Sequence, residues 1–124
     1  MPKLPKISEA EWEVMKVLWE EAPLTANTIV ARLSGKSEWK PKTVKTLINR
    51  LLQKRALGFE KVERTYSYHP IISRDECLQA ENRSFLERVH GGDLQGMLAS
   101  FIDSEELSVA DLAELKEILN RKKG

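Results

Sequence analysis

Six polar side chains between Lys42 and Arg50 have the types and spacing to bind an acceptor-rich surface. They are cations, hydroxyls and one amide: Lys42, Thr43, Lys45, Thr46, Asn49 and Arg50. No acid interrupts residues 40–55, whereas a solvated helix usually mixes charge signs, because Glu–Lys pairs four residues apart stabilise it. Donors without acids suit the base edges of the DNA major groove and the phosphates beside them. The sequence therefore predicts that this stretch binds double-stranded DNA.

These side chains divide into two expected roles. Thr43, Lys45 and Thr46 are the candidates for base edges, since Thr offers a methyl and a hydroxyl and Lys can donate to guanine. Phosphate contacts that position the protein are expected from Lys42, Arg50, Lys54 and Arg64. Replacing Thr46 with Ala should relax sequence preference, whereas Lys54→Ala should weaken binding to all DNA about equally and lower the salt slope by about one.

An amphipathic helix over residues 40–55 is predicted to position these groups. Pro41 suits the first helical position, because its φ is already helical and its missing N–H would have had no partner there. Apolar residues recur at steps of three and four on the other face, as Val44, Leu47, Ile48, Leu51 and Leu52. The helix should therefore bury one face and expose the polar one.

Two shorter helices are predicted before it. Residues 8–11 form a Ser-x-x-Glu capping box, and the helix that they open stops before Pro23. Its stripe includes Trp12 and Trp19, which are expected as core anchors. Thr25 then caps a short helix over 26–33, and Gly35 is expected in the left-handed conformation as the turn into the next helix begins. Two short helices followed by a basic third are typical of a helix-turn-helix.

A β-hairpin is expected after the basic helix. From Phe59 the polar and apolar side chains alternate with a period of two, and the hairpin should turn near residues 63–65. A hairpin at this position is the wing of a winged helix. Arg64, at the expected tip, could reach a phosphate or the minor groove.

Three amphipathic helices are predicted in the remaining chain. Ser73, Asp93 and Ser108 are their expected caps, and Gly91-Gly92 ends the first. Such a short segment cannot bury its own apolar stripes, so a second copy of the chain is expected to cover them. The predicted dimer contacts are Leu78, Phe85, Leu86, Val89, Leu94, Met97, Leu98, Phe101, Ile102, Leu112, Leu115 and Leu119.

Charge supports the same division of the chain. Residues 1–70 hold 13 Lys+Arg and 8 Asp+Glu, a formal charge of +5, whereas residues 71–124 hold 7 and 11, a charge of −4. The basic excess is concentrated on one predicted helix face and the hairpin after it, which favours polyanion binding over simple solubility. The expected domains are therefore 1–72, a winged helix-turn-helix, and 73–124, a three-helix dimerisation domain, in a mainly α fold with a small β-wing.

Composition argues against several other classes of protein. Cys77 is the only cysteine and His69 and His90 are far apart, so we expect no disulfide, metal site or cofactor. The apolar runs are too short to span a bilayer and no leader opens the chain, which predicts a cytoplasmic protein. An enzyme would need paired carboxylates, a metal cluster or an activated nucleophile, and none is evident. A winged-helix adaptor that binds only protein is the remaining alternative, and it would show no tight DNA binding.

The chain resembles the penicillinase repressors of the BlaI/MecI type, which are winged-helix regulators of β-lactamase and methicillin-resistance genes. The resemblance spans nearly the whole chain and rests on residues 7–15 (ISEAEWEVM), 39–51 (WKPKTVKTLINRL), 84–86 (SFL), Gly91-Gly92 and Phe101. It implies a dimeric repressor that binds palindromic operators with TACA/TGTA half-sites through Lys42, Thr43, Lys45, Thr46 and Arg50. Copper-responsive repressors share the fold but carry a C-terminal cysteine cluster, which this chain lacks.

The resemblance also implies a route of induction. In the family a membrane-bound antibiotic sensor with a metalloprotease domain triggers a cut before a phenylalanine of the dimerisation domain, which corresponds here to Ser100–Phe101. The family commonly has Asn before that Phe, and Ser before the proline where Lys40 stands. The alternative function is a regulator of the same fold that controls other genes and is relieved by a small ligand or another signal.

Overall fold

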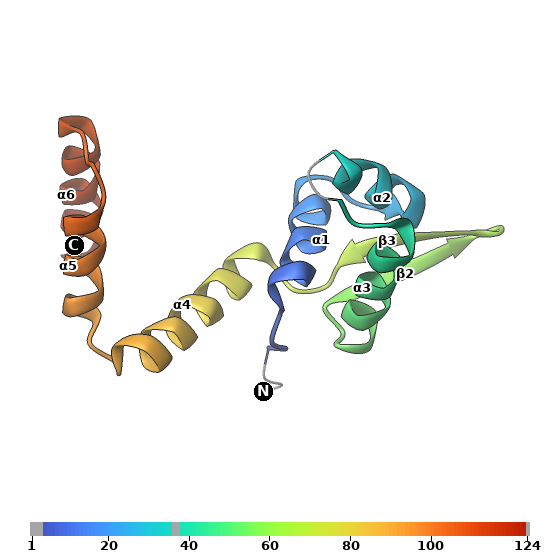
Figure 1. Ribbon diagram of the computed structural model, residues 1–124, viewed down its shortest axis with the longest axis horizontal. Coiled ribbons are helices and arrows are strands. Elements are labelled where there is room, and N and C mark those ends of the chain that lie inside the picture. The colour runs from blue at the N-terminus through green and yellow to red at the C-terminus, as the bar shows by residue number, and fades with distance from the viewer. Residues whose placement is uncertain (1–3, 36–37, 124) are drawn as a thin grey trace. The chain divides into compact units, whose positions relative to one another are not determined.

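The computed structural model describes residues 4–35 and 38–123, which are mainly helical with one small sheet. In chain order the elements are α1 (Glu9–Glu20), β1 (Leu24–Thr25), α2 (Ala26–Ser34), α3 (Pro41–Gln53), β2 (Leu57–Val62), β3 (Thr65–Pro70), α4 (Arg74–His90), α5 (Leu94–Ser104) and α6 (Val109–Lys123) (Figure 1). The predicted fold class is confirmed. The chain divides into two compact units inside α4, one up to Ala80 and the other from Glu81.

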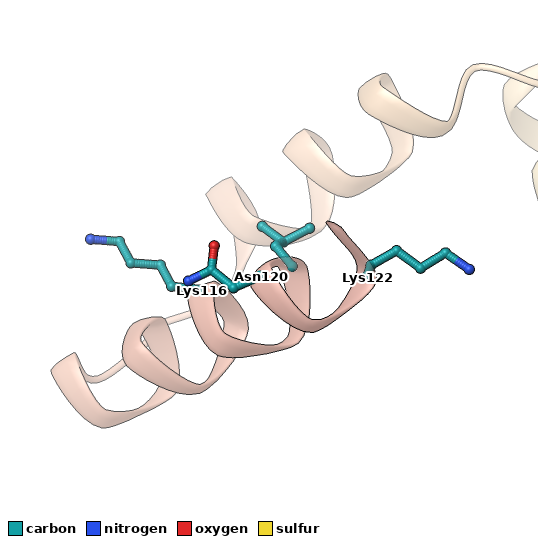
Figure 2. Close-up of a pocket in the computed structure, with 4 residues that line it drawn as sticks. Lys116, Asn120 and Lys122 are labelled. Atoms are coloured by element: carbon teal, nitrogen blue, oxygen red, sulfur yellow. The ribbon is translucent and has the colours of Figure 1, made fainter. Parts of the chain in front are cut away.

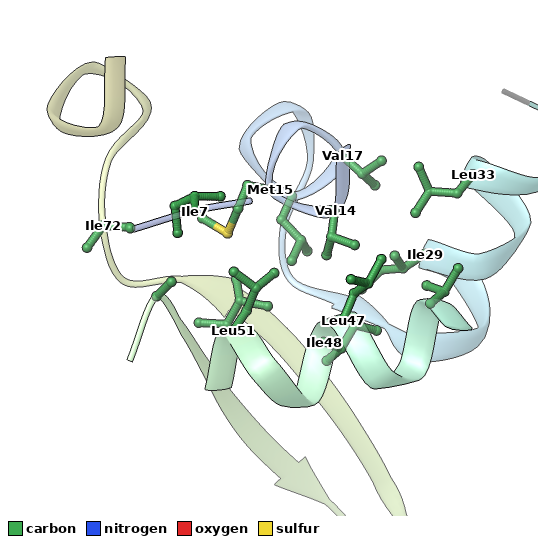
Figure 3. Packing of buried hydrophobic residues seen from close by; sticks show 14 of the residues in the cluster. Ile7, Val14, Met15, Val17, Ile29, Leu33, Leu47, Ile48, Leu51 and Ile72 are labelled. Atoms are coloured by element: carbon green, nitrogen blue, oxygen red, sulfur yellow. The ribbon is translucent and has the colours of Figure 1, made fainter. Parts of the chain in front are cut away.

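The three helices of the first unit bury one apolar core between them (Figure 3). Its most enclosed side chains are Val14, Met15 and Leu18 of α1, Ile29 and Leu33 of α2, and Val44, Ile48 and Leu51 of α3. α1, α2 and α3 each contact the other two. The apolar stripe predicted for residues 40–55 is therefore buried, and α3 is held with its other face outward.

The two tryptophans of α1 lie at the edge of this core. Trp12 and Trp19 are half-buried, and their rings meet edge to face with centroids 5.5 Å apart. Trp19 Nε1 donates to the Ile72 carbonyl oxygen at 3.1 Å. Both rings pack against the core, as expected of anchors, and the Trp19 N–H finds its partner at a backbone carbonyl.

A three-stranded antiparallel sheet in the order β1-β3-β2 completes the first unit. The β2–β3 hairpin pairs Leu57 with Pro70 and Val62 with Thr65, and it extends beyond the helices (Figure 1). Glu63 and Arg64 form its tip, with Glu63 at a φ of 60°. The tip lies where the sequence predicts it, whereas the two-residue β1 is too short for alternation to reveal it.

Most helix ends follow the predicted capping chemistry. Ser8 and Glu11 exchange both capping-box hydrogen bonds, Thr25 accepts from the Thr28 N–H, and capping bonds also form at Ser73, Asp93 and Ser108. Gly91 and Gly92 have φ values of 58° and 87° after α4. The expectation for Gly35 is wrong: its φ is −82°, because α2 ends in a tight right-handed turn with the Gly35 N–H directed at the Leu33 carbonyl. The turn predicted between this helix and the next includes residues 36 and 37, which lie outside the described residues.

The second unit leaves its apolar side chains uncovered. None of residues 81–122 is buried. Of the predicted dimer contacts, five are half-buried, Leu78, Phe85, Leu86, Met97 and Leu115, and seven are exposed, Val89, Leu94, Leu98, Phe101, Ile102, Leu112 and Leu119. Across the part of the chain that the structure describes, no helix is long and apolar enough to cross a membrane.

Candidate nucleic-acid interface

The outward face of α3 carries the predicted DNA-binding residues. Because Val44, Leu47, Ile48 and Leu51 face the core, the helical period turns the polar positions to solvent. All six lie exposed: Lys42, Thr43, Lys45, Thr46, Asn49 and Arg50. The Thr46 hydroxyl donates to the Lys42 carbonyl oxygen at 3.0 Å. Its proton is therefore engaged, and Thr46 presents a methyl group and an acceptor oxygen to any ligand.

The two ends of α3 are fixed by its backbone. Lys40 is the N-cap but makes no side-chain capping bond, and its carbonyl accepts from the Thr43 N–H at 2.9 Å. At the other end the Arg55 N–H donates to Leu52 O at 3.0 Å and the Ala56 N–H to Leu51 O at 2.9 Å. This pair of bonds is a Schellman motif with Arg55 in the left-handed position, at a φ of 63°.

The wing is joined directly to this helix end. Ala56 and Leu57 are buried, and the Ile71 N–H donates to the Ala56 carbonyl at 2.9 Å, which closes the base of the hairpin. Arg64 is exposed at the tip. The hairpin thus extends a basic side chain away from the base on which α3 ends.

An exposed aromatic pair lies along the wing. The Phe59 and Tyr66 rings meet edge to face with centroids 5.4 Å apart, and Lys61 Nζ lies 5.5 Å from the Tyr66 ring centroid. The sequence predicted the strands but not this pair, because its members come from opposite strands and meet only through the hairpin register. The wing therefore carries a second cation, Lys61, in addition to Arg64 at its tip.

Lys54 is a predicted DNA contact whose charged group is bound within the protein. Its Nζ lies 2.5 Å from Glu11 Oε1 and donates to the Lys6 carbonyl oxygen at 2.8 Å. Burial raises the pKa of the Glu11 carboxyl, but hydrogen bonds from Lys54 and Ser8 outweigh it and leave that pKa below its ordinary value. Sequence reasoning identified Glu11 only as a capping residue, since Lys54 lies 43 positions away.

The residues predicted for cleavage, and nearly all of those predicted for dimer contacts, belong to the second unit. Ser100 and Phe101 are consecutive exposed residues inside α5. A hollow lined by Lys116, Leu119, Asn120 and Lys122 runs along α6 (Figure 2). All four residues belong to one helix, so the hollow is part of the uncovered surface and not an enclosed ligand site. Within the described ranges no group of three or more His, Cys, Asp or Glu side chains could hold a metal ion.

A helix-turn-helix with a basic third helix and a β-wing defines a winged-helix DNA-binding protein. The penicillinase repressor family model matches residues 7–121, and the chain belongs to this family of DNA-binding transcriptional repressors. The resemblance inferred from the sequence is thereby confirmed.

Known proteins are similar over both the whole chain and the first unit. The penicillinase repressor of Bacillus licheniformis is 39% identical over 99% of each chain. The methicillin resistance regulatory protein MecI of Staphylococcus aureus is 32% identical over 94% of this chain and 95% of its own. The solution structure of monomeric B. licheniformis BlaI with the blaP half-operator covers 61% of this chain and 93% of its own, with 42% identity and a TM-score of 0.54.

Proposed function

We propose that the protein is a dimeric repressor that binds a palindromic operator with TACA/TGTA half-sites and controls a β-lactamase or related resistance gene. The observation that carries this proposal is the acid-free, exposed face of α3 on a winged helix. The 42%-identical BlaI unit, solved with a half-operator, supports the assignment of that face to DNA. Each subunit inserts α3 into a major groove, and two-fold symmetry spaces the half-sites by about one turn, roughly 34–36 Å.

The proposed contacts follow from position on the helix. Thr43, Lys45 and Thr46 face base edges near the start of α3, where recognition helices contact bases. Lys42, Asn49 and Arg50 flank them towards the phosphates, and Arg64 reaches the backbone or minor groove from the wing tip. Because the Thr46 hydroxyl proton is engaged by Lys42 O, its methyl group is the feature that a thymine methyl can contact.

The uncovered side chains of α4, α5 and α6 form the proposed dimer interface. Phe101 is 56% exposed and Leu119 is 64% exposed in the single chain, five of the other ten predicted contacts are exposed as well, and the remaining five are half-buried. So many large apolar side chains exposed on three successive helices are typical of an interaction site. An identical partner is favoured because the operator proposed for α3 is itself two-fold symmetric.

Dimerisation gives the second unit control over DNA affinity. Once one half-site is bound, the other is reached at an effective concentration of order mM, so avidity exceeds either single contact by ~10²–10⁴. Cleavage at Ser100–Phe101 by a protease that a membrane sensor activates would remove α6 and residues 101–104 of α5 from the interface. Because that bond lies inside a helix, α5 must unwind locally before a protease can cut it.

Titration on a palindromic and a scrambled duplex tests the function. The full chain should shift the TACA–TGTA duplex at much lower concentration than the scrambled one, and sedimentation should give a dimer at micromolar concentration. A chain that ends at Ser100 should sediment as a monomer and lose the avidity factor while still binding a single half-site. A monomeric full chain that does not distinguish the duplexes would refute the proposal.

A further inference from the structure

Lys54 links three segments of the first unit through one ammonium group. Its Nζ contacts the Glu11 carboxylate in the first turn of α1 and the Lys6 carbonyl before that helix. Lys54 is also the C-cap of α3, where its own N–H donates to Arg50 O at 3.0 Å. The contact therefore ties the end of the DNA-facing helix to the start of α1 and to the segment that precedes it.

The Glu11 side of this link is buried. Its exposed fraction is 1%, and it is the only charged residue buried in the described ranges 4–35 and 38–122. The carboxylate also accepts from the Ser8 N–H at 2.9 Å. Replacing a buried ion pair with apolar residues of similar volume is often neutral or stabilising, so stability is a weak reason for such a pair. Orientation is a better reason for this pair. A salt bridge is directional, whereas an apolar contact at the same place would let α3 rotate against α1.

The same contact makes Lys54 a poor ligand for phosphate. Its side chain is 34% exposed, and its charge is matched by the Glu11 carboxylate. Lys42 and Lys45, in contrast, lie exposed on the outward face of α3. For Lys54 to reach a phosphate, the buried Glu11 carboxylate would be left without its cation, which is strongly unfavourable.

We infer that Glu11 and Lys54 form a positioning pair that holds the C-terminal end of α3 at the angle operator recognition requires. This inference rests on the proposed function, because it takes α3 as the helix that reads DNA. Base contacts need side chains held to within about 0.5 Å, whereas attraction to phosphates tolerates larger shifts. Loosening the pair should therefore reduce discrimination between DNA sequences more than general affinity for DNA.

The test compares Glu11→Gln, Lys54→Met and their double variant in the full chain. The matched control is Glu13→Gln with Lys16→Met. These two residues also form an ion pair on α1, with Lys16 Nζ 3.2 Å from Glu13 Oε1, but this pair is exposed to solvent. Affinities for the TACA–TGTA palindrome and for a scrambled duplex are measured at several salt concentrations, with circular dichroism to verify folding. Lys54→Arg serves as the rescue variant.

We expect each single substitution to weaken palindrome binding by about threefold to thirtyfold, with a smaller change for the scrambled duplex and no change in salt slope. The double variant should be no weaker than the weaker single variant, because both substitutions break the same contact. Lys54→Arg should recover most of the affinity, and the control substitutions should change it less than about twofold.

Three results would overturn the inference. One is Lys54→Met weakening both duplexes equally and lowering the salt slope by about one, which would make Lys54 a phosphate contact. A second is Glu11→Gln tightening DNA binding by freeing that cation, and a third is additive effects in the double variant. If Glu11→Gln does not fold, the slope and discrimination of Lys54→Met decide alone. A wild-type chain that cannot distinguish the duplexes would refute the proposed function as well, whereas the three results above refute only the positioning pair.

Discussion

Replacing Phe101 with alanine tests the proposed dimer interface most directly. Phe101 is 56% exposed in the single chain, and a phenylalanine of roughly 200 Å² therefore leaves about 110 Å² for a partner to cover. At ~25 cal/mol per Å², that area contributes about 3 kcal/mol in each subunit. Alanine retains about a third of the surface and two-fold symmetry doubles the loss, so Phe101→Ala should weaken the dimer by about 4 kcal/mol, close to a thousandfold.

Sedimentation equilibrium over a range of concentrations measures the dimer directly, and gel shifts report its consequence for DNA. Binding to the full palindrome should weaken as the dimer dissociates, whereas binding to a duplex with one half-site should not change. Val62→Ala is the matched control, because Val62 is a 65% exposed apolar side chain on the wing, outside the proposed interface. A dimer constant within about threefold of wild type, or a parallel loss of half-site affinity, would show that the interface lies elsewhere.

Further predictions concern the core, acid stability, the buried thiol and base reading. Ile48→Ala should lower the free energy of unfolding by about 3 kcal/mol in urea denaturation, since the Ile48 side chain is fully buried on the inward face of α3. The folded pKa of Glu11 lies below its ordinary value of 4.5. The ionised carboxyl therefore contributes its full stabilisation above pH 4.5 and loses it as the pH falls through the lower, folded pKa. Glu11→Gln should flatten that part of the curve of stability against pH. Burial, and then the nearby Glu76 carboxylate, raise the pKa of the Cys77 thiol, so a disulfide reagent should modify the native chain far more slowly than the unfolded chain. Thr46→Ala should reduce operator discrimination by about 1 kcal/mol in competition gel shifts, whereas Thr46→Val, which keeps a methyl at that position, should retain it.

The features that the sequence predicted correctly depend on interactions between near neighbours. Capping boxes span four residues, and the apolar stripe of α3 repeats within two turns, so both can be recognised without the rest of the fold. The same helical period exposes the polar face of α3, which is why every candidate contact on that helix lies at the surface. The wing was recognised from alternation over strands of six residues.

The features that were missed depend on tertiary contacts or on backbone choice. β1 exists only because residues 24 and 25 meet β3, and two residues carry no periodic signal. The sequence predicts a left-handed Gly35 at the end of α2, but Gly35 is right-handed. In the first unit the left-handed residue at a helix end is Arg55, and an arginine has no intrinsic preference for that conformation. The ion pair between Lys54 and Glu11 is invisible in the sequence, because only the fold brings the two side chains together.

Under the proposed function, dimerisation would let a signal received by the second unit control DNA binding by α3. α5 and α6 contain 11 and 15 residues, lengths at which isolated helices are marginal in water, and residues 81–122 include no buried side chain. In the proposed dimer, much of their folding free energy would therefore come from association, and folding and dimerisation would form one coupled equilibrium. A cut within α5 would shift that equilibrium towards separate subunits, and each of them would retain an intact α3 that could still bind one half-site. On this proposal repression would end through loss of avidity alone, because the proposed DNA contacts all belong to the first unit and the proposed cleavage site belongs to the second.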